Sequence, residues 1–99
     1  MTLEEEFDEA CRAAVAECIA LGYHPSAWIA MMDRWGSVEA ARRLVVSGEV
    51  QTGFERLIRM SRSDLTVEHA VLEPRWSSFF TDEHRAAAQW RLQQGRGPS

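Results

Sequence analysis

Apolar residues recur at helical spacing along residues 3–21, and this pattern constrains the fold more than any other feature of the chain. Phe7, Cys11, Ala14, Cys18 and Leu21 follow one another at intervals of four, three, four and three residues. Such intervals place side chains on one face of an α-helix. The pattern therefore predicts an amphipathic helix that lays a narrow apolar stripe on the rest of the molecule.

Glycines, prolines and capping residues divide the remaining chain into further helices. Gly22 and Gly36 are suited to end helices, because glycine tolerates the left-handed backbone found there. Pro25 is expected as the first residue of a second helix, where its missing N–H costs nothing. Thr2 and Glu5 are expected to form a capping box at the start of the first helix, and Ser37 and Thr66 are expected to cap later helices. The predicted helices begin near Leu3, Pro25, Ser37, Thr52, Thr66 and Thr81.

The chain is long enough for one hydrophobic core, since it has 99 residues. We therefore predict a compact all-α single domain of five or six short helices over residues 1–94, with a disordered tail at residues 95–99. Trp76, Phe79 and Phe80 are expected to close one end of the core, and Trp90 is expected to point inward from the last helix.

Charge is distributed unevenly along the sequence. The formal net charge is −4, but five of the fifteen acidic residues lie within the first nine positions, which leaves ten acids against eleven arginines elsewhere. An acidic N-terminus is the opposite of a secretory or organellar signal. No apolar run approaches the roughly twenty residues that span a bilayer. The sequence therefore predicts a cytoplasmic protein without a membrane partner.

The residue types that carry catalysis are present, but not in productive patterns. Cys11 and Cys18 are separated by two helical turns, about 10 Å by helix rise, which exceeds the span of a disulfide. They are expected to be small buried apolar residues. Glu68 and His69 are sequence neighbours, which diverge by about 100° on a helix, so Glu68 is interpreted as a first-turn anion. We predict no catalytic residue, no metal site and no cofactor.

Tryptophan and arginine, which often dominate protein interfaces, are the features that most favour binding. The chain has four tryptophans, and Trp28 and Trp35 lie seven residues apart on one face of a predicted helix. These two tryptophans are either core residues or part of an interface. The leading hypothesis is a non-catalytic module that binds another protein or itself through a face containing Trp28, Trp35, Arg56 and Arg59.

A second hypothesis is a small nucleic-acid-binding domain. Residues 40–62 contain five arginines against two acids, and clustered arginines can contact phosphates. The acidic net charge of the whole chain argues against this reading. The arginines that would carry the contact are Arg42, Arg43, Arg59 and Arg62.

Part of the chain also resembles a known family. Gly53-Phe54 followed by Leu57, and then the run Asp64-Leu65-Thr66-Val67-Glu68, is similar to a pattern in a family of small bacterial all-helical proteins. Those proteins occur alone or beside larger nuclease-like or defence-related enzymes, so the resemblance implies an accessory role and transfers no catalytic residue. The likeness extends over residues 22–92 and also includes Gly22, Tyr23, Pro25, Met31, Gly36, Ala40, Ala41, Leu44, Leu72, Phe79, Phe80, Arg91 and Leu92.

Overall fold

The computed structural model describes residues 1–47 and 52–95, with the side chains of residues 52, 53 and 95 excepted. All the regular structure in these residues is helical, and the described residues contain no strand. This confirms the all-α prediction. Residues 48–51 and most of the tail predicted at residues 95–99 lie outside the described residues. The elements are α1 (Leu3–Ala20), α2 (Ser26–Trp35), α3 (Ser37–Val46), α4 (Thr52–Arg59), η1 (Ser63–Leu65), α5 (Val67–Leu72), η2 (Pro74–Phe79) and α6 (Asp82–Gly95).

Local capping explains where several helices begin and end. The Thr2 hydroxyl accepts a hydrogen bond from the Glu5 backbone N–H, while the Glu5 carboxylate accepts one from the Thr2 N–H, which is a complete capping box at the start of α1. Gly22 has a φ of 91° and ends the helix as predicted. The Thr66 side chain caps α5 by accepting from the His69 N–H. These three predictions from sequence are confirmed.

Two predicted helix starts are wrong by one residue. Pro25 occupies the position before α2, which begins at Ser26. Gly36, with a φ of 82°, occupies the position before α3, so Ser37 is the first helical residue and its hydroxyl does not cap the helix. Instead, Ser37 donates a hydrogen bond to Asp8 of α1. A tertiary hydrogen bond has therefore replaced the local one that the sequence predicted.

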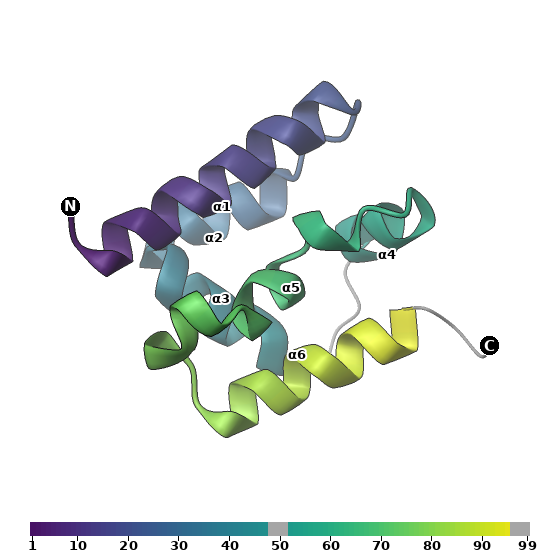
Figure 1. The fold of residues 1–99 in the computed structure, drawn as a ribbon. Coiled ribbons are helices and arrows are strands. Elements are labelled where there is room, and N and C mark those ends of the chain that lie inside the picture. The colour runs from purple at the N-terminus through teal and green to yellow at the C-terminus, as the bar shows by residue number, and fades with distance from the viewer. Residues whose placement is uncertain (48–51, 96–99) are drawn as a thin grey trace.

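Helix α3 lies at the centre of the fold. In Figure 1, α1 lies on one side and α6 on the other, with α3 and α5 between them, and α3 contacts α1, α2, α5 and α6. Because neighbours surround it, the whole inner face of α3 is buried, as the sequence predicted. The buried apolar residues of this helix are Val38, Ala40, Ala41, Leu44 and Val45.

An aromatic cluster joins the first helix to the later part of the chain. The ring centroid of Phe7 lies 5.2 Å from that of Trp76, 5.8 Å from that of Phe79 and 5.7 Å from that of Phe80, all in edge-to-face geometry. Such pairs add to the stabilisation from burial alone. The predicted aromatic cluster therefore exists, and Phe7 of α1 is its central member.

Trp90 corrects one prediction about the core. Its side chain is 56% exposed instead of pointing inward. The inner face of α6 is formed by Ala88, Arg91 and Leu92, which are all buried. Successive helical residues are rotated by about 100°, so a helix that buries these three residues turns Trp90 toward solvent.

None of the described helices is both long enough and apolar enough to cross a bilayer.

Candidate functional site

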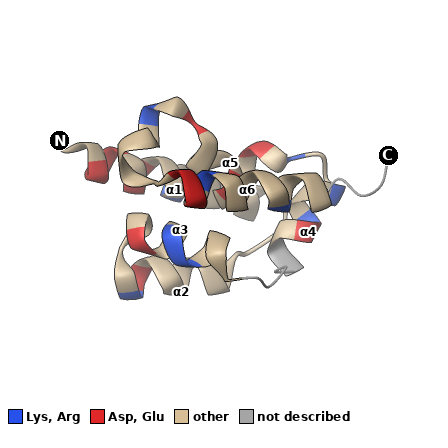
Figure 2. Cartoon of the chain, turned by 90° about the horizontal axis from the view of Figure 1, so that it is seen from below, with Lys and Arg blue, Asp and Glu red and all other residues tan. Residues whose placement is uncertain are grey.

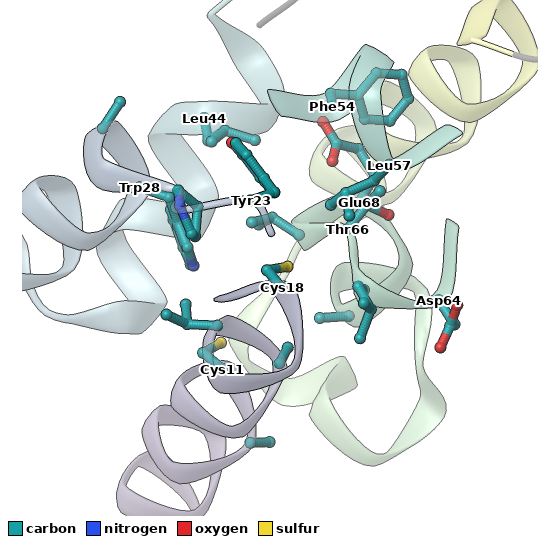
Figure 3. Close-up of a pocket in the computed structure, with 18 of the residues that line it drawn as sticks. Cys11, Cys18, Tyr23, Trp28, Leu44, Phe54, Leu57, Asp64, Thr66 and Glu68 are labelled. Atoms are coloured by element: carbon teal, nitrogen blue, oxygen red, sulfur yellow. The ribbon is translucent and has the colours of Figure 1, made fainter. Parts of the chain in front are cut away.

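A pocket of about 620 Å³ lies between α1, the start of α2, α4, η1 and α5. Figure 3 shows side chains from these elements converging on it, with Cys18 and Tyr23 from the end of α1 and the turn that follows, and Phe54 and Leu57 from α4. Ligand sites in proteins commonly have volumes of roughly 300–1,000 Å³ and mostly apolar walls. The pocket is therefore the candidate functional site.

Helix α1 supplies one long wall of the pocket. Its lining residues follow intervals of three and four and extend from residue 7 to residue 18, a distance of about 16 Å by helix rise. Phe7, Cys11 and Cys18 are buried, whereas Ala14 and Val15 are half-buried. The small side chain of Ala14 leaves room beside the helix. The apolar stripe predicted from sequence thus both packs on the core and borders the pocket.

The opposite wall comes from α4, η1 and α5. Phe54 and Leu57 of α4 are 7% and 5% exposed, and Leu65 of η1 is 9% exposed. Leu57, Leu65 and Cys18 form a small cluster with Ala14 packed against it. This cluster lies apart from the main core, so α4 is held to α1 across the pocket by few apolar contacts.

One buried ion pair interrupts the apolar lining. Arg91 Nε donates a hydrogen bond of 2.6 Å to Glu68 Oε2, and the two side chains are 3% and 2% exposed. The Arg91 guanidinium also lies 5.7 Å from the centroid of the Phe54 ring. Glu68 lies in the first turn of α5, as predicted, but its carboxylate also turns inward to a partner on α6 that was not predicted. The pairing of Arg91 with Glu68 was not predicted from the sequence.

The mouth of the pocket is formed by its exposed lining residues, which are Ala10, His24, Ser26, Ala27, Arg56 and Asp64. Arg56 lies with its guanidinium carbon 5.3 Å from the centroid of the Tyr23 ring, and it donates a long hydrogen bond of 3.4 Å to the Gly22 carbonyl. Burial raises the pKa of the Tyr23 hydroxyl, so this group stays protonated beside the arginine. The mouth therefore combines an aromatic ring with a cation.

Asp64 lies at the mouth but is already neutralised. Arg62 donates to the Asp64 carboxylate at 3.1 Å and to Glu17 at 3.2 Å. The Arg62 hydrogen bond lowers the pKa of Asp64 and keeps it ionised. By contrast, no carboxylate of residues 1–47 and 52–95 lies within 4.0 Å of Arg56. Among the described residues, no carboxylate pairs with Arg56, so its positive charge is available to a ligand at the mouth.

Both cysteines line the pocket as protonated thiols. They are free and buried, as predicted. Burial raises the pKa of Cys11 to about 12, and burial also raises the pKa of Cys18. Because the thiolate is the reactive form, these side chains act as apolar wall groups at neutral pH.

The four residues predicted to bind a partner do not form one surface. Trp28 is 8% exposed and lines the pocket together with Arg56. Trp35 lies at the end of α2 under the guanidinium groups of Arg34 and Arg43, at 5.0 Å and 4.5 Å. Arg59 is exposed on α4. The structure therefore brings two of the four, Trp28 and Arg56, to the candidate site.

The four arginines of the nucleic-acid hypothesis each lie near an acidic side chain. Arg42 and Arg43 both approach Glu39, at 3.6 Å and 2.9 Å. Arg59 approaches Glu55 at 3.8 Å, and Arg62 approaches Glu17 and Asp64. Figure 2 shows acidic and basic residues interspersed along the helices. The geometry thus gives no strong positive surplus for phosphate binding.

Two of the three histidines do not line the pocket. His69 lies 3.6 Å from Glu73, one turn away on the surface, and His84 is engaged in the cap of α6 with Thr81. Within the described ranges, no group of three or more His, Cys, Asp and Glu side chains is arranged to hold a metal ion. The pocket combines a mostly apolar wall with the buried Glu68–Arg91 pair and with Arg56 at its mouth.

Comparison with known proteins finds no matching family model, no similar curated protein and no similar solved structure. The resemblance carried by residues 22–92 therefore stays a prediction. The pocket and its mouth are the observations from which a function can be argued.

Proposed function

We propose that the protein is a non-catalytic interaction module that accepts an apolar helical segment of another protein in the pocket. The observation that supports this most strongly is a pocket of about 620 Å³ in a chain of 99 residues. Apolar wall side chains that no protein atom covers stay in contact with water and lack packing partners.

Water fills such a space poorly when its walls are apolar, because a buried water needs several polar partners. The larger part of the walls consists of Ala, Cys, Val, Leu, Phe and Trp side chains, and several of the polar lining residues lie at the mouth. An apolar guest would replace this water and restore the missing contacts of the wall. The pocket therefore favours a hydrophobic occupant.

The shape of the pocket favours a helix as that occupant. Its α1 wall is about 16 Å long, or three helical turns, and the members of this wall that solvent reaches are Ala10, Ala14 and Val15. Helix-in-groove recognition uses apolar side chains at positions i, i+3 or i+4, and i+7, which cover such a length. The wall residues Ala10 and Ala14 are small, so a helix can approach α1 closely. Trp28 and Phe54 supply the larger aromatic surfaces on which such a helix would pack.

An accessory role agrees with this proposal. The family that residues 22–92 resemble includes proteins found beside larger nuclease-like or defence-related enzymes, and an enzyme of that kind is the partner class that we propose. A module without acid–base machinery of its own contributes to such an enzyme by binding. We place this interaction in the cytoplasm.

A pocket-filling substitution tests the proposal. Ala14→Phe places a ring into the pocket, whereas Ala13→Phe places the same ring on the exposed side of α1, away from the pocket lining. Tagged wild type and both variants are purified from the native cell, and co-purifying proteins are quantified by mass spectrometry. We expect one protein at near-equal molar ratio with wild type and Ala13→Phe, and its loss with Ala14→Phe. Equal recovery with both variants would contradict the proposal.

A further inference from the structure

Arg56 is a charged side chain held at the mouth of the pocket, and its position points to the chemistry of the occupant. It belongs to α4, the same helix that contributes Phe54 and Leu57 to the pocket wall. Building on the proposed function, we infer that the bound helix carries an Asp or Glu next to its apolar anchors, and that this carboxylate pairs with Arg56.

The guanidinium is oriented before any ligand arrives. The Tyr23 ring lies 5.3 Å from its central carbon, and the Gly22 carbonyl accepts from one of its nitrogens at 3.4 Å. A cation over an aromatic face and a hydrogen bond both restrict the side chain. An arginine that is already restricted loses less conformational entropy when it binds a carboxylate. The turn after α1 thus positions Arg56 for a ligand.

The guanidinium also keeps donors available. Its fork of N–H groups matches the two oxygens of a carboxylate, and within the described part of the chain the hydrogen bond to Gly22 is a long one. Neighbouring arginines differ in this respect. Arg62 contacts Asp64 and Glu17, and Arg59 contacts Glu55. Charge complementarity at the mouth therefore favours an anionic group on the occupant.

The buried polar side chains of the lining already have partners within the chain. Arg91 donates to Glu68, and the Thr66 hydroxyl donates to the Ser63 carbonyl and accepts from the His69 N–H. The apolar wall and Arg56 at the mouth therefore determine which occupant fits. A helix presents apolar anchors on one stripe and polar side chains beside it. The occupant that we assign is therefore an amphipathic helix with an acidic residue at the end that lies near Arg56.

Selection from a random peptide library displayed on phage tests this inference. Wild type, Arg56→Glu and Arg59→Glu are each used as bait; Arg59 is 77% exposed on the same helix but does not line the pocket. We expect wild type and Arg59→Glu to select peptides with apolar residues at i, i+4 and i+7 and an enriched Asp or Glu. Arg56→Glu should lose that acidic preference and gain Lys or Arg. A peptide selected on the wild-type protein should bind Arg56→Glu about tenfold more weakly than wild type, which is a loss of about 1.4 kcal/mol in binding free energy.

The outcomes separate this inference from the proposed function. Apolar peptides that lose binding to Ala14→Phe, yet show no acidic bias and no response to Arg56→Glu, would overturn the inference and leave the pocket as a helix site. Failure to select any peptide sensitive to Ala14→Phe would count against both.

Two measurements address other occupants. A homodimer that Ala14→Phe dissociates in sedimentation would assign the pocket to a second copy and overturn the inference. A stoichiometric fatty acid retained in native mass spectra of wild type, and absent from Ala14→Phe, would overturn it as well. A monomer that retains no such ligand supports the assignment of a partner helix.

Discussion

Arg91 Nε lies 2.6 Å from Glu68 Oε2, and this buried pair connects α6 to α5 at the edge of the pocket. Both side chains are almost fully removed from solvent. Charges in such surroundings are tolerated because each is paired with the other. Arg91 shares the buried face of α6 with Ala88 and Leu92, and Trp90 lies on the exposed side of this helix.

Removing one member of this pair should be strongly destabilising. Glu68→Gln leaves the Arg91 charge buried without its carboxylate, so the free energy of unfolding should fall by about 3–5 kcal/mol. Urea denaturation followed by circular dichroism measures the change. The double variant Glu68→Leu with Arg91→Met should recover most of the loss, and Glu83→Gln on the exposed face of α6 should have almost no effect. A loss below about 1 kcal/mol in Glu68→Gln would contradict the pairing.

Two phenylalanines should differ in their contribution to stability. Phe7 is 0% exposed and contacts three aromatic rings, so Phe7→Ala should cost about 3–5 kcal/mol. Phe54 is also buried, but it borders the pocket, so Phe54→Ala removes fewer packing contacts and should cost less. Chemical denaturation of both variants checks the order. A larger loss for Phe54→Ala would show that α4 packs more tightly on the core than the structure indicates.

The Cys11 thiol should make stability depend on alkaline pH. Its pKa is raised by burial from 9.0 to about 12, so the folded state holds this proton more tightly than the unfolded state. Stability from this group is complete below pH 9 and is lost as pH rises toward 12, at up to about 1.4 kcal/mol per pH unit.

The comparison between wild type and Cys11→Ala isolates this effect, because Tyr23 and Cys18 titrate in both proteins. The variant should be less stable at pH 7 but should lose less stability between pH 8 and pH 11. Urea denaturation across this range provides the measurement. Parallel curves for the two proteins would mean that Cys11 is not buried in the folded state.

Gly36 should resist substitution because of its backbone conformation. Its φ is 82° and its ψ is 158°, a region that L-residues with a Cβ rarely adopt. A Cβ built at this position meets no atom within 4 Å, so the cost of Gly36→Ala is conformational and should be about 1–3 kcal/mol. A lower melting temperature in differential scanning calorimetry is the expected result. An unchanged melting temperature would indicate that the α2–α3 junction relaxes without cost.

The sequence predicted those features that depend on nearby residues. The apolar stripe of α1, the capping box at Thr2 and the cap at Thr66 each follow from residues within a few positions of one another. Glu68 and Arg91 are separated by 23 positions, so local rules placed Glu68 in the first turn of a helix but could not identify its partner. Ser37 was misplaced for the same reason, because its partner Asp8 lies on another helix.

The pocket was not predicted because it depends on how far apart two helices pack. The sequence identified one wall, the α1 stripe, but interpreted it entirely as core. Its second wall comes from α4 and α5, which contact α1 only after the chain has folded. Ala10 and Ala14 were a signal in retrospect, since small residues on an apolar face leave space where a neighbour does not fill it.

The dissociation constant of the captured partner, or of a selected peptide, for Ala14→Phe and Ala13→Phe tests the central claim most directly. Isothermal titration calorimetry measures it, with melting curves to verify that both variants are folded. Occupation of the pocket predicts that Ala14→Phe binds at least about tenfold more weakly than wild type, while Ala13→Phe binds as wild type does. Unchanged binding to a folded Ala14→Phe would contradict the claim that the pocket is the binding site.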